Sequence, residues 1–375
     1  MIDRFKEIFN NRRQLARERV EGGQKVIGWV CTYVPEEMIH AAGILPFRVV
    51  GGEHVETPLA DGYLYTNLCS FSRNCLEEGL SGQLDFLHGY VSCNSCDHIR
   101  RLFDNWMQFM KTPYTRALGV PCKVTPATLK YFVQDLTLFR RDLEEITGEK
   151  VSDEALWEAI RVYNRTRTLL EELYEMRKAD PPPISGADVM EVVRAACVLP
   201  RDEYNQLLEE LLQDVRGRRR PEAEDHYRLM IYGSELDSPD YIRIIEELGS
   251  IVVTDDLCMG SRYFRGEVKV NGDPLRALAE RYLTKPMCPR MHPAPERIKY
   301  LQQLARDFHV DGVIHQSLKF CDLHAGQFLV SKAGYDKIGV PVLNLEREYA
   351  LSGHGQIRTR VSAFFEALEG RRIEQ

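Results

Sequence analysis

The sequence predicts an α/β fold with two doubly wound parallel-sheet domains and a helical insertion between them. Short, β-prone apolar segments alternate with helical segments in the first and last thirds of the chain, which is typical of parallel strands joined by helices. In the middle third, the apolar residues recur at helical spacing instead. The length of 375 residues also suits two or three domains, each with its own core.

The first predicted domain comprises residues 1–125 and begins with a polar helical segment over residues 1–24. The strands expected after it are Val26–Val30, Phe47–Val50, Phe86–Val91 and Arg116–Val120. The helices expected between them are Pro35–Ala42, Cys69–Leu80 and Asp97–Met110. Pro35 suits a first helical turn, where Glu36 and Glu37 complement the positive helix N-terminus. Gly43 is placed to end that helix.

The second predicted domain, residues 126–225, is helical and closes with a linker. Between Ala127 and Gln213 a helical stripe is formed by Leu156, Ile160, Tyr163, Leu170 and Leu173. Ser152 is a suitable N-cap, and Gly148 and Pro181–Pro183 end helices. The charged, breaker-rich segment Gly217–Asp225, which contains Arg218–Arg220, predicts the boundary with the next domain.

The third predicted domain, residues 226–375, returns to the α/β alternation. Its expected strands are Leu229–Tyr232, Ile251–Thr254, Gly312–Ile314 and Pro341–Leu345. Polar residues follow these strands directly, and a last helix is expected over Gln356–Leu368.

Composition excludes several classes of function. A net charge of −7 argues against a nucleic-acid-binding protein. No apolar run approaches the roughly 18–20 residues that span a bilayer, and Met1–Glu7 is an amphipathic helix start rather than a signal peptide, so we expect a cytoplasmic protein without membrane contact. The chain has neither a phosphate-binding loop of the GxxxxGK[ST] type nor a GxGxxG turn between a strand and a helix. We therefore expect ATP chemistry to come from a partner.

Ten cysteines are many for such a chain, and reduced cytosolic thiols point to metal or redox chemistry. Five of them follow predicted strands or open predicted helices: Cys31, Cys69, Cys96, Cys258 and Cys321. Cys288 lies in the loop Lys285–Pro289, so three of these six cysteines come from each α/β half. Ligands bind at that edge of open α/β sheets, so a cleft between the two domains would bring the six together.

Thiolates near helix N-termini suit an iron–sulfur cluster. Zinc sites usually show closely spaced cysteine pairs, and only Cys93–Cys96 has that spacing. We expect Cys75, Cys122 and Cys197 to be small buried hydrophobic residues, and the role of Cys93 stays open.

The motifs resemble those of the 2-hydroxyacyl-CoA dehydratase and benzoyl-CoA reductase family over almost the full length. They occur in the family's order: Cys31-Thr-Tyr-Val-Pro-Glu-Glu37 with Ala41-Ala-Gly43, Leu68-Cys69, Ser95-Cys-Asp97, Asp256-Leu-Cys-Met-Gly260, Pro286-Met-Cys-Pro289, Lys319-Phe-Cys-Asp322 and Gly355-Gln-Ile-Arg-Thr-Arg360. Within the family, this series of motifs is most similar to that of the smaller, active-site-type subunits of ATP-dependent benzoyl-CoA reductases.

The resemblance implies a cofactor between the two α/β domains. Its dehydratase members hold a [4Fe-4S] cluster with three cysteines, which map here to Cys69, Cys96 and Cys321. Other members hold a double-cubane [8Fe-9S] cluster with further cysteines, which map to Cys31, Cys258 and Cys288. Because the chain carries all six, we expect the double cubane ahead of the single cubane.

The resemblance also implies partners: a homologous subunit in a homo- or heterodimer, a separate ATP-hydrolysing iron–sulfur activator and an acyl-CoA substrate. We expect a reductase subunit acting on an aromatic thioester such as benzoyl-CoA. The alternatives are a (R)-2-hydroxyacyl-CoA dehydratase subunit, a stand-alone double-cubane reductase of small molecules without a CoA substrate, and a non-catalytic partner subunit.

Proton donors are needed near such a cluster. The candidates are His98, His315, His324 and Glu346, each of which could equally be a surface or hydrogen-bonded core residue. Arg73 and Arg262 are candidates for contacting CoA phosphates, with pairing to a local carboxylate as the alternative.

Overall fold

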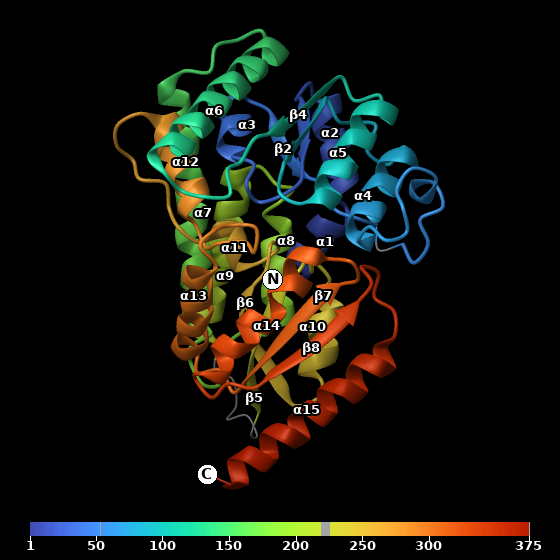
Figure 1. Cartoon of the computed structure of the whole chain (residues 1–375). Helices are drawn as coiled ribbons and strands as arrows, with labels where there is room; N and C mark the ends of the chain where they lie inside the picture. The colour runs from blue at the N-terminus through green and yellow to red at the C-terminus, as the bar shows by residue number, and fades with distance from the viewer. Residues whose placement is uncertain (53, 219–225, 375) are drawn as a thin grey trace.

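The computed structural model describes residues 1–52, 54–218 and 226–374, with side chains described up to residue 370. Two four-stranded parallel sheets lie one above the other in Figure 1, and a group of long helices runs along their side. The expected α/β class is therefore confirmed. No helix in these described ranges combines the length and apolar character that a membrane crossing would need.

The first sheet has the strand order β2-β1-β3-β4. Its strands are β1 (Val26–Trp29), β2 (Leu45–Arg48), β3 (Gly89–Cys93) and β4 (Tyr114–Leu118). The helices of this part are α1 (Ile2–Asn10), α2 (Arg12–Glu21), α3 (Glu36–Ala41), α4 (Ser70–Leu80) and α5 (Asp97–Phe109), with a short 3-10 turn, η1, at Ala60–Gly62. The order reverses beside β1, so a crevice opens at the carboxyl ends of β1 and β3.

The second sheet repeats this plan with the order β6-β5-β7-β8. Its strands are β5 (Tyr227–Gly233), β6 (Ser250–Asp256), β7 (Gly312–Leu318) and β8 (Val342–Arg347). Its helices are α10 (Pro239–Glu246), α11 (Ser261–Phe264), α12 (Pro274–Thr284), α13 (Ala294–Asp307), α14 (Asp322–Asp336) and α15 (His354–Glu374). The corresponding crevice lies at the ends of β5 and β7.

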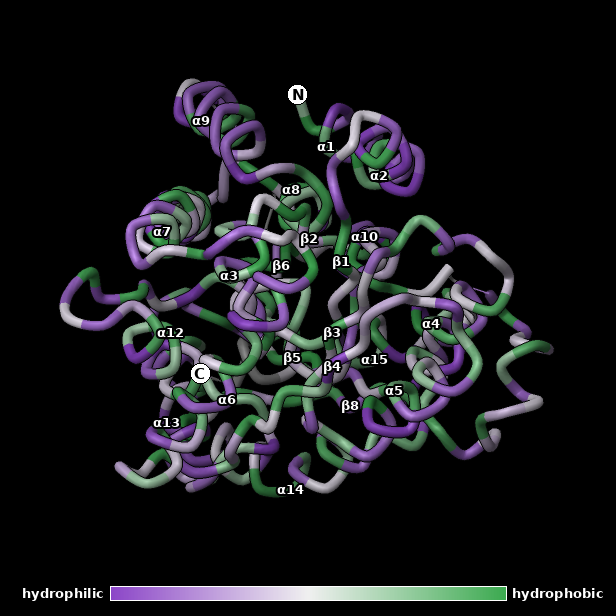
Figure 2. The backbone as a smooth tube through the Cα atoms, turned by 90° about the horizontal axis from the view of Figure 1, so that it is seen from above, coloured by the Kyte–Doolittle hydropathy of each residue, from purple (hydrophilic) through white to green (hydrophobic). Residues whose placement is uncertain are grey.

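The expected helical insertion is present, and in the sequence it lies between the last strand of the first sheet and the first strand of the second. It consists of α6 (Pro126–Thr147), α7 (Asp153–Met176), α8 (Gly186–Ala195) and α9 (Arg201–Gly217). Helix α7 packs on α3 of the first part, and α8 packs both on α1 of the first part and on α10 and β6 of the second. One large hydrophobic cluster accordingly includes residues from both sheets and from the insertion. Figure 2 shows mostly hydrophobic strands in the middle of the molecule and long hydrophilic stretches on α2, α7 and α9.

Several expected boundaries were wrong. The N-terminal helical segment is broken at Asn11 into α1 and α2. Pro35 lies outside α3 as its N-cap residue. In the second sheet, the strands extend further than expected, because Asp255, His315 and Glu346 lie within them and not after them. Most of the expected linker, residues 219–225, falls outside the described residues, and the domain limits at 125 and 225 remain predictions.

Candidate functional site

All six cysteines that the sequence predicts between the two α/β domains line one cavity of about 100 Å³. They come from both halves of the chain: Cys31, Cys69 and Cys96 from the first, and Cys258, Cys288 and Cys321 from the second. Apolar side chains form much of the remaining wall, and the polar side chains there are Arg48, Ser95, Ser234, Glu235 and His324. Residues almost three hundred positions apart thus meet where the two sheets present their carboxyl edges.

Three of the six cysteines are N-cap residues. Cys69 precedes α4, Cys96 precedes α5 and Cys321 precedes α14. None of the three side chains forms a regular capping hydrogen bond, but the first-turn backbone N–H groups of Ser72, Ile99 and His324 lie close enough to these sulfurs to favour their thiolate forms against the effect of burial. An anionic group bound at these thiols would meet the positive ends of three helices. We call these residues the N-cap cysteines.

The other three lie in turns and loops. Cys31 follows β1 with a φ of 79°, a backbone conformation that is uncommon for a residue with a side chain. Cys258 lies between β6 and α11, and Cys288 lies between α12 and α13, where its backbone N–H donates to the Tyr33 hydroxyl at 3.4 Å. We call these three the loop cysteines.

The thiols differ in acidity. A hydrogen bond from the Cys93 thiol lowers the pKa of Cys31 to about 5, against the opposing effect of burial. Burial raises the pKa of Cys69 and Cys96 above the ordinary thiol value and raises the pKa of Cys258 and of Cys321 to about 12. Neutral thiols in this cavity would therefore need a metal to become thiolates.

Buried cations stand beside the loop cysteines. The Arg262 guanidinium lies 3.3 Å from Cys258 Sγ and 2.9 Å from the Asp256 carboxylate. The Lys285 ammonium donates to the carbonyls of Thr32 and Arg262. Within the described residues Lys285 forms no ion pair. Burial and the charge of Arg281 lower the pKa of Lys285 well below its ordinary value, whereas negative charge on the sulfurs of Cys31, Cys258 and Cys288 raises it, so the ammonium form needs an anion at this site.

Arg48 crosses from the first sheet to the second. Its guanidinium donates to the Cys258 carbonyl at 2.9 Å and to the Glu235 carboxylate at 2.8 Å. Arg290 makes the reverse connection, from the Cys288 loop to the carbonyls of Ser95, Val120 and Pro121. These two arginines hold the two sides of the cavity together.

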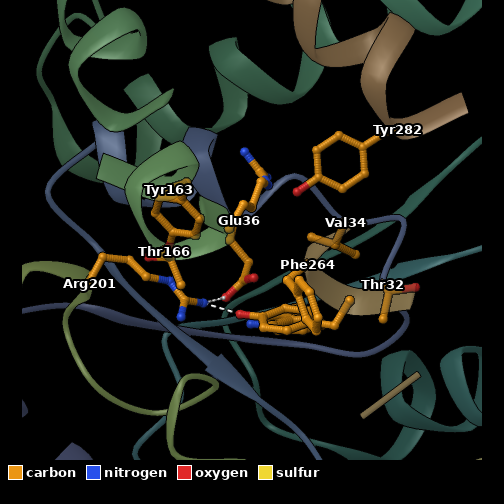
Figure 3. Close-up of a pocket in the computed structure, with 11 residues that line it drawn as sticks. Thr32, Val34, Glu36, Tyr163, Thr166, Arg201, Phe264 and Tyr282 are labelled. Atoms are coloured by element: carbon orange, nitrogen blue, oxygen red, sulfur yellow. Dashed lines mark hydrogen bonds and ion pairs between the residues drawn. The ribbon is translucent and has the colours of Figure 1, made fainter. Parts of the chain in front are cut away.

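Beneath the Cys31 turn lies a second, much smaller cavity of about 10 Å³, which is lined by Thr32 and Glu36 (Figure 3). Glu36 pairs there with Arg201 at 2.8 Å, while Glu37 pairs with Arg167 and accepts a hydrogen bond from Tyr282 at 2.8 Å. Both glutamates lie in the first turn of α3, as expected for residues that complement the helix N-terminus, and both are also buried in ion pairs that fix α3 and the preceding turn on the insertion.

The four candidate proton donors are placed differently. Only His324 lines the cavity, and burial together with Arg262 lowers the pKa of His324 well below its ordinary value. His98 accepts from the Cys69 backbone N–H at 3.2 Å through Nδ1. His315 is bonded to Asn344 at 2.7 Å, behind His324. Glu346 is exposed on β8 and does not line the cavity.

The remaining sequence candidates have local roles. Cys75 and Cys197 are buried as expected, but Cys122 is exposed, so its expected burial was wrong. Cys93 is buried in β3 and bonds Cys31. Arg73 pairs with Asp61 at 3.1 Å, and Arg262 is buried against Asp256, so each has the local carboxylate partner that was the alternative to a CoA phosphate.

The donor set fits an iron–sulfur group. Within the described ranges, no three His, Cys, Asp or Glu side chains converge tightly enough to hold a single metal ion. The six thiols are instead distributed around the wall of one cavity, which suits a polynuclear group bound by cysteine sulfur. Such a group is anionic, which matches the buried, unpaired Lys285.

Sequence reasoning missed Arg48, Glu235 and Lys285. Arg48 and Glu235 meet across 187 positions of sequence, so no local pattern connects them. The available signal was a single polar residue at the end of an otherwise apolar strand, as in Arg48 of β2.

Comparison with known proteins gives consistent matches. The family model described as "2-hydroxyglutaryl-CoA dehydratase, D-component" matches residues 31–368. One of the benzoyl-CoA reductase subunits of Thauera aromatica is 32% identical over 312 residues, which cover 81% of each chain. The (R)-phenyllactyl-CoA dehydratase beta subunit of Clostridium sporogenes is 27% identical over 97% of each chain. The beta subunit of (R)-2-hydroxyglutaryl-CoA dehydratase from Acidaminococcus fermentans is 26% identical over 98% of this chain and 99% of the relative.

Proposed function

The chain belongs to the 2-hydroxyglutaryl-CoA dehydratase D-component family, and from this membership we propose that it is the iron–sulfur subunit of a low-potential reductase acting on an acyl-CoA thioester. The observation that carries the proposal is the cavity lined by six cysteines. The 32% identity to a benzoyl-CoA reductase subunit supports an aromatic thioester such as benzoyl-CoA as the substrate.

We assign the cluster ligands to two sets. Cys69, Cys96 and Cys321, the N-cap cysteines, hold one [4Fe-4S] unit. Cys31, Cys258 and Cys288, the loop cysteines, hold the second unit of a double cubane. The assignment is supported by the different surroundings of the two sets, with helix N-termini at the first and buried cations at the second.

A bound iron–sulfur cluster would supply the transfer of single electrons at low potential. The chain's own residues prepare the site for it. The walls formed by Val30, Phe71, Ile99 and Leu318 exclude water, and the first-turn N–H groups of α4, α5 and α14 face negative charge on sulfur. His324 is the candidate proton donor that reaches the cavity, and we assign proton handling to it.

The proposed assembly contains a homologous subunit and a separate ATP-hydrolysing iron–sulfur activator. The relatives are named as subunits, which supports the first partner. The sequence has no phosphate-binding loop, so ATP hydrolysis in this system belongs to another protein.

A second candidate function is a (R)-2-hydroxyacyl-CoA dehydratase subunit. It is favoured by the relatives that match nearly the full length, since three of them are named as dehydratase beta subunits. The two functions are separated by product analysis of the reconstituted complex, supplied with reductant, ATP and either benzoyl-CoA or a (R)-2-hydroxyacyl-CoA. Reduction of the aromatic ring supports the first function, and formation of an enoyl-CoA supports the second.

The proposal is tested by measuring iron and acid-labile sulfide per chain after purification without oxygen. We expect about eight irons in the wild type and about half of that in Cys31→Ser and in Cys69→Ser. The matched control is Cys75→Ser, a buried cysteine outside the cavity, which keeps the wild-type content.

Two other results decide against parts of the proposal. About four irons that persist in Cys31→Ser but are lost in Cys69→Ser would replace the double cubane with a single cubane on the N-cap cysteines. A wild-type protein free of iron under these conditions would overturn the proposed function.

A further inference from the structure

Buried positive charge lies on one side of the cysteine cavity. Arg262 contacts the sulfur of Cys258, and Lys285 lies directly behind it. At the N-cap cysteines, the sulfur of Cys69 meets a neutral group, the Ser72 hydroxyl, at 3.6 Å. Arg73 acts on Cys69 by its charge, but it is matched by Asp61 at 3.1 Å. The two sets of thiols therefore stand in different electrostatic surroundings.

Lys285 lies close to all three loop cysteines in the structure or in the sequence. Its ammonium donates to the carbonyl of Thr32, which follows Cys31, and at 3.2 Å to the carbonyl of Arg262, whose own side chain contacts Cys258. It also lies three positions before Cys288. The aromatic ring of Tyr33 is 4.7 Å from Nζ, so the surroundings of this charge are apolar and poorly screened.

The charge balance of the described residues leaves Lys285 without a carboxylate. Arg48 is matched by Glu235, and Asp256 is shared by Arg262 and Arg297. A buried lysine that bonds only carbonyl oxygens is costly unless an anion lies within reach. Burial and Arg281 lower the pKa of Lys285 well below its ordinary value, and the groups that favour its charged form are the sulfurs of Cys31, Cys258 and Cys288, so an anionic group bound at these sulfurs keeps Lys285 protonated.

We propose that Lys285 is a positioning residue that acts through Thr32 and Arg262 and by its charge, so that the unit held by the loop cysteines is reduced more easily than the unit held by the N-cap cysteines. This inference rests on the proposed function. Uptake of one electron adds one negative charge and breaks no bond, and a fixed positive charge close to one unit favours reduction of that unit.

The test is a potentiometric titration, followed by EPR, of the protein purified with its iron. Lys285→Met removes the charge and keeps most of the side-chain volume. We expect unchanged iron content and a reduction equilibrium weakened at least tenfold for one of the units, which is a shift of about 59 mV to more negative potential for a one-electron couple. Lys285→Arg, which keeps the charge, retains a potential closer to that of the wild type.

The matched control is Arg228→Met. Arg228 is a buried cation that bonds the carbonyls of Phe308, Ala179 and Arg177, but it lies at the start of β5, at the far end of the sheet from the cysteines. Its replacement disturbs a similar set of carbonyl contacts without removing charge from the site. The potentials in this control therefore stay at the wild-type values.

The outcomes separate the inference from the proposed function. A wild type without iron overturns the function. A wild type that holds iron, with the same potentials in Lys285→Met, overturns the inference alone, as does an equal shift in Arg228→Met. If Lys285→Met is not recovered folded, Arg262→Gln takes its place in the test. This variant removes the guanidinium at Cys258, while Arg297 still pairs with Asp256. Its potential must then show the same shift.

Discussion

At the residue scale, Cys31 stands out because its thiol is acidic before any metal is bound. Cys93, directly behind it in the neighbouring strand, donates to its sulfur and lowers its pKa to about 5. The other cavity thiols with a resolved shift move in the opposite direction, because burial penalises the thiolate. In the metal-free protein, Cys31 is thus the cavity cysteine expected to react first with a metal or an electrophile, because it is already a thiolate at neutral pH.

Alkylation of the metal-free protein tests this acidity. The thiolate is the reactive form, so Cys31 should react with iodoacetamide at a nearly constant rate above about pH 6 and more slowly below pH 5. In Cys93→Ala the same profile should move to higher pH. Mass spectrometry of the labelled peptides gives both rates, with the exposed Cys122 as the reference for accessibility. A Cys31 rate that rises only above pH 8 would contradict the lowered pKa.

Gly233 is a residue-scale constraint on the site. It ends β5 with a φ of 147°, and an added Cβ would overlap the Gln316 carbonyl oxygen of β7. Gly233→Ala must therefore push β5 and β7 apart beside Glu235, and we expect it to lower the free energy of unfolding by about 4 kcal/mol or more. Gly148→Ala, also at positive φ but with open space around it, should cost about 1–2 kcal/mol. Urea denaturation of the two variants compares these values, and equal costs would rule out the close approach.

At the element scale, α3 is held by charge as well as by apolar packing. Burial alone would raise the pKa of Glu37, but Arg167 and Arg281 outweigh it and keep that pKa below the ordinary value. Because the folded-state pKa is depressed, this carboxylate stabilises the fold above the unfolded pKa, and the contribution is lost as the pH falls below about 4.5.

Glu37→Gln tests the buried pair. It leaves Arg167 buried with no carboxylate, so we expect a loss of about 3–5 kcal/mol in the free energy of unfolding at pH 7. The variant should also lose less stability than the wild type between pH 5 and pH 3. A surface pair between α7 and α9, Arg165 with Glu209, gives the matched control, and Arg165→Ala should change stability by about 1 kcal/mol or less. Chemical denaturation across this pH range measures all three chains.

The elements also show why strand limits were harder to predict than strands. Apolar runs predicted eight strands correctly in kind, but the runs stop where Asp255, His315 and Glu346 begin, while the strands continue. The carboxyl ends of parallel strands face the site and carry polar residues. The apolar sequence pattern therefore ends there one or more residues before the hydrogen-bonded strand does. In β2, Pro46 argues against a strand in the sequence, so the start of this strand was not predicted. The proline is tolerated because β2 lies at a sheet edge.

At the scale of the whole molecule, the cavity depends on contacts between the two sheets. Five of the six cysteine positions were predictable because each follows a local strand or helix signal, whereas Cys288 lies in a loop. The closing contacts were not, since Arg48 with Glu235 and Arg290 with Ser95 join residues almost two hundred positions apart. Such pairs depend on the relative placement of two sheets, on which a single sequence carries little information.

Arg290→Met should loosen this junction without unfolding either sheet. The variant loses three hydrogen bonds to the carbonyls of Ser95, Val120 and Pro121, which tie the Cys288 loop to the first sheet. We expect the backbone amides around Ser95 and Cys96 to exchange hydrogen at least tenfold faster, and those in the centre of β5 to exchange as in the wild type. Exchange mass spectrometry measures both regions. Uniform acceleration across both sheets would instead indicate global destabilisation.

The repeated strand order has a consequence for biosynthesis. Each sheet supplies only part of the cavity, and the last contributor, Cys321, is made 290 residues after Cys31. At a translation rate of 5–20 residues per second, roughly 15–60 s separate the two cysteines on the ribosome. During that interval the first sheet can form and present three cysteines to solvent with no counterpart. Insertion of iron and sulfide is thereby a late step in the life of the nascent chain, and the early thiols must be kept from oxidation until the second sheet closes over them.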